Sequence, residues 1–508
     1  MSQVAPQDAV DPHNKRFGVE TNGINFIPLE ERKMTHRQLS LFWIASSFYP
    51  FNLLLGILVY SLGMPVWLTL VVVLGVGLAG YIYPAFASIA GARSGIATQA
   101  VTRVTYGVQA NRLNNLIGWA VGIAYEIANV VGGVFAGVAL FDQLGWSGGN
   151  GPKIVSFFIV YGVSVLLPYL GHATVIYVQR FFAVVLIVAS ALMFISLVPN
   201  LDLNASIGDI GISQWSAFMI GCGIVLAGGW GYVMMAADYP RYMSDKTPGN
   251  SIFWTVLTSA GLPAIFLGLI GVLMAAQGDF DALIADPVGG AKTLFSTPIF
   301  LVWLIAAIGG SIANNALTLY SAGLAAQAVG LPLKRYQATI VDAAIATIGI
   351  VYILFKDDGG FLTWMNSILV FSVVWLGPFG AIWLMDLAWR HWLALPEEVH
   401  GGRHSPFWGM SGARRYAWIA LIAGMVAAFL CISVPKYTGP IAESLDFTDY
   451  SWVVGPIIAA VLYFVLAKNT VRDEVTHRLE RLPKDSEIDT AEAFDTGVDH
   501  SLFEHDKD

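Results

Sequence analysis

The residues best suited to chemistry in this sequence are amides, aromatic rings and carboxyl groups that lie inside long apolar segments. One such segment carries Tyr125, Glu126 and Asn129, and another carries Asn314 and Asn315. Tyr125 and Asn129 are four residues apart, so a helix places them on one face. An aromatic ring stacks on a flat heterocycle, and an amide offers its edge a paired donor and acceptor. These residue types therefore favour a binding site for a small planar molecule.

Each of these polar groups admits a structural reading as well. Glu126 is either a functional carboxyl group or half of an interhelical hydrogen bond or ion pair. Asn314 and Asn315 point about 100° apart on a helix, so one can hold a ligand while the other ties helices together.

A glycine-rich stretch at 226–242 interrupts the sixth apolar segment. Gly228, Gly229 and Gly231 surround Trp230, and glycines weaken a helix because they lose the most backbone entropy on folding. In a membrane such a break is tolerated where it is buried or lines a wet cavity. The stretch indicates either a broken helix at a substrate site or close helix packing through small residues.

The first apolar segment contains a similar interruption. Ser47, Pro50 and Asn52 lie near its middle, and proline removes a backbone donor and clashes with the preceding turn. Two interrupted segments, five apart in order, predict an inverted repeat of five plus five helices. In that arrangement substrate and ion sites lie at the midplane, between the two breaks.

Two further acidic residues are candidates for other roles. Asp238 precedes Arg241 at the end of the sixth segment, where an ion pair that anchors or gates is expected; Asp238 is also a candidate for ion or proton coupling. Asp342 is either a proton carrier or a partner of Lys334 or Arg335.

The composition predicts an all-α polytopic membrane protein. The chain is 56% hydrophobic and 12% charged, about half the charged fraction of a soluble domain. Cys222 and Cys431 each lie alone in an apolar segment and are expected to be packing residues. We expect twelve transmembrane helices, near residues 39–63, 66–90, 114–141, 154–170, 175–198, 214–236, 251–276, 298–328, 336–355, 360–387, 413–434 and 451–467.

The positive charges orient these helices. With both termini in the cytoplasm, all but four of the 27 Lys and Arg residues fall on the inner side; the four are Lys153, Lys292, Lys356 and Lys436. This asymmetry follows the positive-inside rule and predicts a plasma (inner) membrane protein.

The same pattern divides the chain into four parts. We expect a cytoplasmic arm at 1–38 and a ten-helix transport core at 39–387, with repeats at 39–198 and 214–387. Two peripheral helices at 413–467 and a disordered, acidic cytoplasmic tail at 468–508 follow.

Several classes of protein are excluded by missing motifs. The sequence has no phosphate-binding glycine loop, no His/Cys cluster with metal spacing and no His-Glu-x-x-His motif. We therefore expect no enzyme activity, no cofactor and no bound metal, and no nucleic acid or obligate protein partner.

The order of several short motifs resembles the nucleobase:cation symporter family, most closely its purine–cytosine permease branch. The motifs stand at residues 18–20, 27–28, 30–32, 91–95, 103–107, 132–133, 237–242 and 314–324. The resemblance implies a leucine-transporter-like core of five plus five helices with two peripheral helices, working by alternating access.

The resemblance also implies a set of site residues. Trp230, beside Gly229, and an aromatic residue of the third helix, here Tyr125, would sandwich the substrate ring. Asn129 is the nearest match to the family's third-helix amide, although it is offset by one position. The remaining implied substrate contacts are Asn314 or Asn315 on the eighth helix and Asn52 on the first.

The chain departs from the sodium-coupled members of this family. Those members carry a hydroxyl pair one turn before the eighth-helix amide, whereas this turn contains only Ser311. With Ser47 and the carbonyls near Pro50, that is a thin ligand set for sodium. We therefore favour proton coupling, with Glu126 and Asp238 as candidate carriers.

These observations predict a secondary transporter that imports a nucleobase or a related heterocycle by H⁺ or Na⁺ symport. The alternatives are the same fold carrying allantoin, a hydantoin, a thiamine-like compound, an amino acid or an amine. A channel or sensor is disfavoured because the buried amides form no continuous polar stripe.

Overall fold

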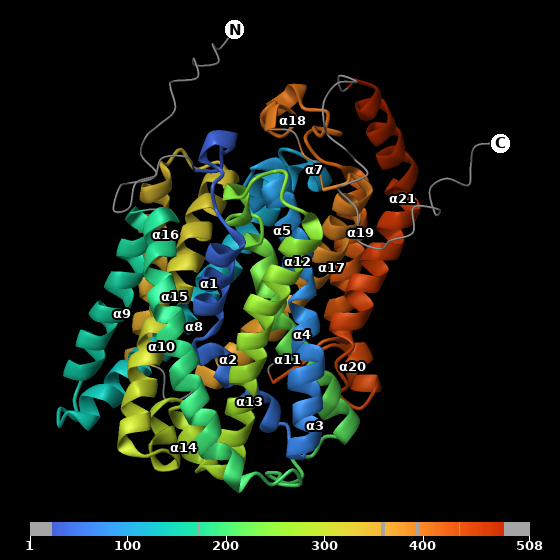
Figure 1. The fold of residues 1–508 in the computed structure, drawn as a ribbon. Coiled ribbons are helices and arrows are strands. Elements are labelled where there is room, and N and C mark those ends of the chain that lie inside the picture. The colour runs from blue at the N-terminus through green and yellow to red at the C-terminus, as the bar shows by residue number, and fades with distance from the viewer. Residues whose placement is uncertain are drawn as a thin grey trace.

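The computed structural model describes residues 23–481, apart from residues 171, 357–360, 393, 395 and 436. The chain forms a bundle of long, nearly parallel helices (Figure 1). α1 begins and α21 ends at the same end of this bundle, which we call the termini end; α14 lies at the opposite end.

The first half of the bundle begins with a bent helix pair. α1 starts at a capping box, in which Thr35 accepts from the backbone N–H of Gln38, and Pro50 opens α2 at a 51° bend. The helices of this half are α1 (His36–Ser47), α2 (Pro50–Tyr60), α3 (Val66–Leu70), α4 (Gly77–Gly80), α5 (Ile82–Ser94), α8 (Asn111–Gln143), α9 (Gly151–Leu170) and α10 (His172–Leu197).

The second half repeats this order and begins with another broken helix. α11 (Gln214–Trp230) gives way at Gly231 to a short 3-10 turn, η4 (Gly231–Met235). The later helices are α12 (Gly249–Val256), α13 (Leu262–Gln277), α15 (Thr297–Val329), α16 (Arg335–Lys356) and α17 (Phe361–Trp389).

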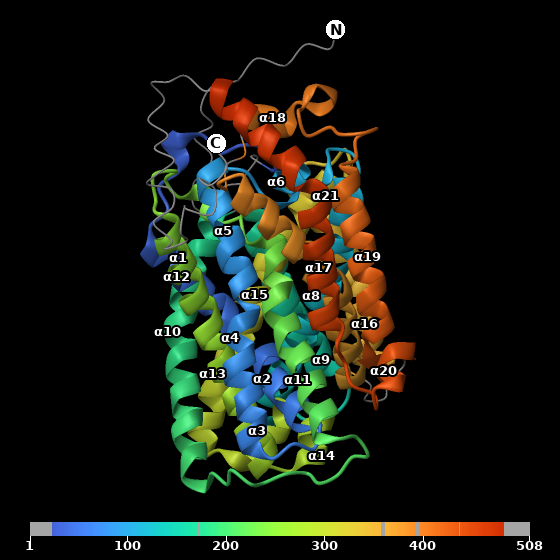
Figure 2. The same cartoon turned by 90° about the vertical axis from the view of Figure 1, so that its right-hand side faces the viewer.

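Shorter elements and two outer helices complete the described chain. α19 and α21 pack on each other and on α17, at the edge of the bundle (Figure 2). The remaining elements are α6 (Thr98–Val101), α7 (Arg103–Tyr106), α14 (Phe280–Ala285), α18 (Pro396–His400), α19 (Arg415–Cys431), β1 (Ser433–Val434), β2 (Tyr437–Thr438), α20 (Pro440–Ser444) and α21 (Ser451–Arg481).

All twelve apolar segments of the sequence coincide with helices. In the described part of the chain ten helical stretches are long and apolar enough to cross a membrane, and the bent pair α1–α2 forms an eleventh. α19 is apolar but shorter, with 17 residues. The most enclosed stretch is Gln214–Met235, whose most apolar 18-residue window is 89% buried, compared with 33% for that of Gly151–Leu170. The broken sixth segment is therefore an interior element, and α9 is an outer one.

The expectation of disorder from residue 468 is wrong for its first part. α21 continues to Arg481 because Val471 is fully buried and the Glu474 carboxylate bonds to Arg390 and Arg414. Residues 482–508 lie outside the described residues, as does the motif at 18–20.

Candidate functional site

A small, mainly apolar cavity with a few polar groups lies where both broken helices meet α8 and α15. Its volume of about 20 Å³ is room for one water, so the described arrangement is closed and a larger ligand requires side chains to move apart. We call it the central cavity, and its lining residues are Tyr49, Gly122, Tyr125, Gly228, Gly231, Tyr232, Met234, Met235, Asn314 and Thr318.

The amide of Asn314 is the hydrogen-bonding hub of this cavity. It donates to the Ser46 carbonyl at 2.5 Å and to the Tyr232 hydroxyl at 2.7 Å, and it accepts from the Asn129 amide at 2.6 Å. Because an amide oxygen has two lone pairs, Asn314 Oδ1 keeps one for a further donor. Asn314 thus connects α1, α8, α15 and the turn that follows α11.

Three tyrosines surround this hub. The Tyr49 ring is parallel to the Phe51 ring at 5.5 Å, and its hydroxyl is 3.5 Å from that of Tyr232. Tyr125 donates to the Ala227 carbonyl at 3.1 Å. Aromatic faces beside an amide give the cavity the chemistry expected for a planar ring.

The first break is held by Asn52. Its amide donates to the Ser47 carbonyl at 2.7 Å, which spans the bend at Pro50 and satisfies an oxygen that the interrupted helix leaves free. Asn52 itself lines a separate small cavity with Tyr81 and Gly268, so the structure does not bring it to the central cavity.

Trp230 and Gly229 lie on the other side of the second break. The Trp230 ring stacks on Tyr83 at 4.9 Å, with an angle of 13° between the planes. A Cβ at Gly229 would lie 2.4 Å from the Gly80 carbonyl carbon, so this glycine permits α11 to approach α4. Gly229 is therefore a packing residue, and Trp230 lies outside the central cavity. Gly228 and Gly231 line the wall of that cavity.

The adjacent amides of α15 face different neighbours. Asn314 lines the central cavity, whereas Asn315 is fully buried beside Glu126. The ambiguity between them in the sequence is resolved by the helical rotation of about 100°. Of the two, only Asn314 is positioned to contact a ligand in this cavity.

Asp238 lies in a satisfied cluster at the termini end. One carboxylate oxygen accepts from the Thr98 backbone N–H at 2.8 Å, and the other accepts from the Gln99 amide at 3.0 Å. The backbone N–H of Ala237 donates back to the Thr98 hydroxyl at 2.9 Å. This reciprocal bonding fixes α6 to the segment after the second break, which is an anchoring geometry.

The candidate sodium ligands Ser47 and Ser311 are buried, and oxygens of their neighbours Ser46 and Ala313 accept from an amide. The Ser47 and Ser311 hydroxyls form no hydrogen bond within the described ranges. Between α1 and α15, Gln179 donates to the Ser46 hydroxyl at 3.3 Å and to the Ala313 carbonyl at 3.0 Å. The two candidate hydroxyls are therefore unengaged among the described residues, whereas two neighbouring oxygens already accept from Gln179.

A second cavity of about 30 Å³ adjoins the first towards the termini end. It shares Gly122 and Thr318 with the central cavity and adds the amide side chains of Gln99 and Asn114. The two cavities give a partly polar route from the breaks towards the Asp238 cluster.

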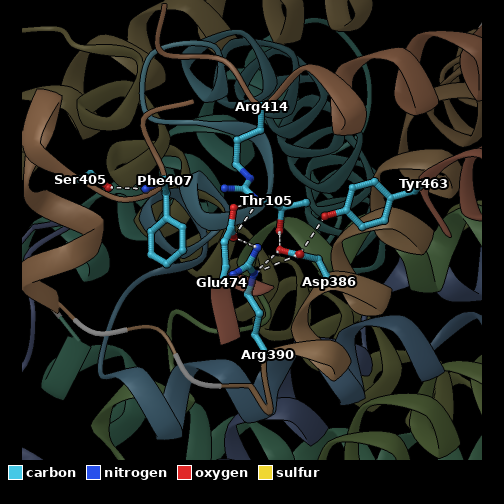
Figure 3. Close-up of polar contacts among 8 residues, drawn as sticks. All are labelled: Thr105, Asp386, Arg390, Ser405, Phe407, Arg414, Tyr463 and Glu474. Carbon is cyan, nitrogen blue, oxygen red and sulfur yellow. Dashed lines mark hydrogen bonds and ion pairs between the residues drawn. The ribbon is translucent and has the colours of Figure 1, made fainter. Parts of the chain in front are cut away.

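A separate cluster of charges ties the outer helices to the core (Figure 3). Asp386 accepts from Arg390 at 3.0 Å, from Tyr463 at 2.7 Å and from Thr105 at 2.6 Å. Glu474 accepts from Arg390 and Arg414, at 2.8 and 2.9 Å. α7, α17 and α21 are thereby joined at the termini end.

Comparison with known proteins connects this architecture to transporters. A profile of the family described as permeases for cytosine/purines, uracil, thiamine and allantoin matches residues 26–455. The chain belongs to this permease family. The match covers both broken helices, α8 and α15, which together build the central cavity.

Several relatives share much of the chain's length. The putative purine-cytosine permease YxlA of Bacillus subtilis is 24% identical over 468 residues, covering 89% of this chain and 96% of that protein. A purine-cytosine permease of Saccharomyces cerevisiae is 23% identical and covers 76% of each chain. A vitamin B6 transporter of the same yeast is 28% identical over 283 residues, about half of each chain.

The fold is that of solved transporters. A nucleobase-cation-symport-1 family transporter, in a closed conformation with bromovinylhydantoin bound, superposes with a TM-score of 0.70 at 14% identity, over 90% of this chain and 96% of that chain. A Na⁺-coupled sialic acid symporter gives 0.56 at 11% identity, over 87% and 91%. The permease is thus a multi-pass membrane protein with the leucine-transporter-like arrangement of five plus five helices.

Sequence reasoning missed two of the cavity tyrosines. Tyr49 is the last residue before Pro50, and Tyr232 is two residues after Trp230. Their positions could have been noticed in the sequence, since both tyrosines lie at the breaks that predicted the site. The direction of the Tyr232 side chain could not be predicted, because the 3-10 turn after Trp230 rotates successive side chains differently from an α-helix.

Proposed function

We propose that this permease imports a nucleobase or a closely related small heterocycle by cation symport through alternating access. The observation that carries this proposal is Asn314, whose amide joins both broken helices beside a cavity walled by tyrosines. An amide with one lone pair free and aromatic faces nearby matches the donors and the flat surface of a base.

In this proposal Tyr125, Tyr232 and Asn314 contact the substrate. Asn129 supports the site by donating to Asn314, and Asn52 supports it by holding the first break. Trp230 acts through packing against Tyr83.

We also propose that the termini end is cytoplasmic, in the plasma or inner membrane. The placement of Lys and Arg residues along the sequence supports this orientation. Residues 39–387 would form the transport core and residues 413–467 the peripheral pair. Reaction of single cysteines near Thr35 and Arg472 with an impermeant thiol reagent in intact cells should be absent, and labelling from outside would reverse the orientation.

The substrate proposal is tested with purified protein. Purines, pyrimidines, allantoin, hydantoins and thiamine are screened by thermal shift in sodium and in choline buffer, because a ligand that binds the native state stabilises it. A hit is then followed as uptake into proteoliposomes. One planar base should stabilise the wild type and stabilise Asn314→Ala much less at the same concentration; stabilisation by an amino acid or a quaternary amine instead would overturn the proposal.

A further inference from the structure

Two carboxyl groups face each other in the interior, next to the central cavity. Glu126 on α8 and Asp342 on α16 are both fully buried and lie side by side. One oxygen of Glu126 accepts from the Tyr161 hydroxyl at 2.8 Å, and one oxygen of Asp342 accepts from the Trp119 indole at 2.5 Å. The second oxygen of each has no hydrogen-bond partner among the residues that the structure describes.

No positive charge balances this pair. In the described part of the chain neither carboxyl group forms an ion pair, and the groups that face them are Tyr161 from α9, Asn315 from α15 and Trp119 from α8. The guanidinium of Arg335, two turns before Asp342, donates instead to the Pro168 carbonyl at 2.7 Å. Arg335, one of the two partners that the sequence offered for Asp342, is therefore engaged elsewhere.

Electrostatic repulsion between the two carboxyl groups favours binding of a proton to the pair. Two negative charges in contact repel each other, and burial strengthens this repulsion and adds a desolvation cost for each charge. Carboxyl groups in this situation share one proton rather than ionise together. The free oxygens of Glu126 and Asp342 are where that proton and a second one can bind.

The pair is connected to the central cavity through α8 and α15. Glu126 follows Tyr125, which lines the cavity, and Asn315, beside Glu126, follows the hub residue Asn314. Asn129, one turn after Glu126, donates to Asn314. A substrate that rearranges the hub must therefore displace the same helices that hold the two carboxyl groups together.

We propose that Glu126 and Asp342 form the proton-binding site that drives this permease. The inference rests on the proposed transport function and adds the identity and location of its coupling ion. The pair holds one shared proton when empty and takes a second from the outer solution, on Glu126 Oε2 or Asp342 Oδ2, when substrate is bound. It returns that proton to the inner solution when substrate leaves.

The chemistry of the surroundings favours a proton over a metal cation. Sodium requires several oxygen ligands, whereas the groups that face this pair in the described residues are one hydroxyl (Tyr161), one amide (Asn315) and one indole N–H (Trp119). At the α1–α15 interface only the Ser47 and Ser311 hydroxyls are unpaired among the candidate ligands in the described residues, and the Ala313 carbonyl already accepts from the Gln179 amide. A proton needs only the two free oxygens.

The test separates substrate exchange from driven uptake in proteoliposomes. Exchange of labelled for unlabelled substrate needs binding and alternating access but no net proton movement. We expect Glu126→Gln and Asp342→Asn to retain exchange and to lose protonophore-sensitive accumulation under a proton gradient. Asp142→Asn, which removes an exposed carboxylate, is the matched control and should retain both activities.

The outcomes are distinguishable. If both variants accumulate substrate as the wild type does, or if the wild type accumulates it only under a sodium gradient, the proton site is wrong. If the wild type exchanges no heterocycle at all, the proposed function fails first. Should both carboxyl variants fail to fold, Tyr161→Phe decides, because loss of its hydrogen bond should move the pH of half-maximal accumulation upward by about one unit. An unmoved profile would overturn the proposal.

Discussion

Two acidic clusters in this permease differ in how their negative charge is balanced. At the termini end Asp386 and Glu474 face Arg390 and Arg414, and both Asp386 oxygens accept hydrogen bonds. In the interior Glu126 and Asp342 face each other, with a free oxygen on each. The first cluster neutralises charge permanently, whereas the second can do so only by binding protons.

This difference separates structural acids from functional ones more clearly than burial does. Asp386, Glu126 and Asp342 are all fully buried, and the sequence shows each as an acidic residue in an apolar segment. What distinguishes them is whether a cation lies opposite. The account therefore predicts that loss of an acid in the first cluster harms folding, and that loss of one in the second harms coupling.

The largest expected effect is on stability. Asp386→Ala removes the buried carboxylate that pairs with Arg390 and accepts from the Thr105 and Tyr463 hydroxyls, and leaves Arg390 only the half-buried Glu474. It should lower the free energy of unfolding by about 3–5 kcal/mol, the cost of breaking a buried pair. Glu126→Gln strands no charge and should lower it far less. Thermal and denaturant unfolding in detergent measure both, with Asp142→Ala, an exposed pair partner of Lys292, as the control at about 0–1 kcal/mol. Equal decreases in the free energy of unfolding for Asp386→Ala and Glu126→Gln would contradict the distinction between a structural and a functional acidic cluster.

The next effect concerns the two amides of α15. Asn314→Ala should weaken substrate binding about 30-fold, or about 2 kcal/mol, because several bonds at the cavity are lost. Asn315→Ala should leave the Kd within about twofold and should alter the pH dependence of uptake, since it lies beside Glu126. Isothermal titration of both variants checks this, and a reversed order would contradict the assignment.

The third prediction compares a glycine that packs against another helix, Gly229, with a glycine that lines the central cavity, Gly122. A Cβ at Gly229 would meet the Gly80 backbone at 2.4 Å, while one at Gly122 would meet nothing within 4 Å. Gly229→Ala should therefore destabilise the protein by about 1–2 kcal/mol through overpacking. Gly122→Ala should keep stability and reduce affinity, because its methyl group enters the cavity. Melting temperatures and substrate Kd values of the two variants test this prediction. A loss of affinity in Gly229→Ala and a loss of stability in Gly122→Ala would contradict the assignment of Gly122 to the cavity wall.

The smallest expected effect is on substrate affinity when the aromatic residues at the second break are substituted. Tyr232→Phe removes a hydroxyl that accepts from Asn314 and should weaken binding about fivefold, or about 1 kcal/mol. Trp230→Phe retains a ring against Tyr83 and should leave the Kd unchanged. A larger loss of affinity in Trp230→Phe than in Tyr232→Phe would indicate that Trp230, rather than Tyr232, contacts the substrate ring.

Much of this arrangement is predictable from the sequence. The twelve segments follow from runs of apolar residues, and both breaks follow from glycine and proline at Gly229, Gly231 and Pro50, whose backbone chemistry is local. The helix continuation beyond Lys468 was missed because its cause, the pairing of Glu474 with Arg390, is a contact between segments far apart in sequence.

The side chains that wall the cavity were less predictable for the same reason. Trp230 was named from the glycines around it and from the family resemblance, whereas Tyr232 lies on the cavity because the regular helical period does not hold across a 3-10 turn. Glu126 was recognisable as a costly residue, but its pairing with Asp342 depends on how α8 packs against α16. Local patterns give the elements and the candidates, and tertiary packing decides which candidates meet.

Proton movement coupled to substrate is the most direct measure of the central claim. Weakly buffered proteoliposomes containing a pH-sensitive dye are given the identified substrate in sodium-free medium. The account predicts that the lumen acidifies as substrate enters the wild type, and that Glu126→Gln gives no acidification although it exchanges substrate. Substrate entry without acidification in the wild type, or acidification undiminished in Glu126→Gln, would contradict it.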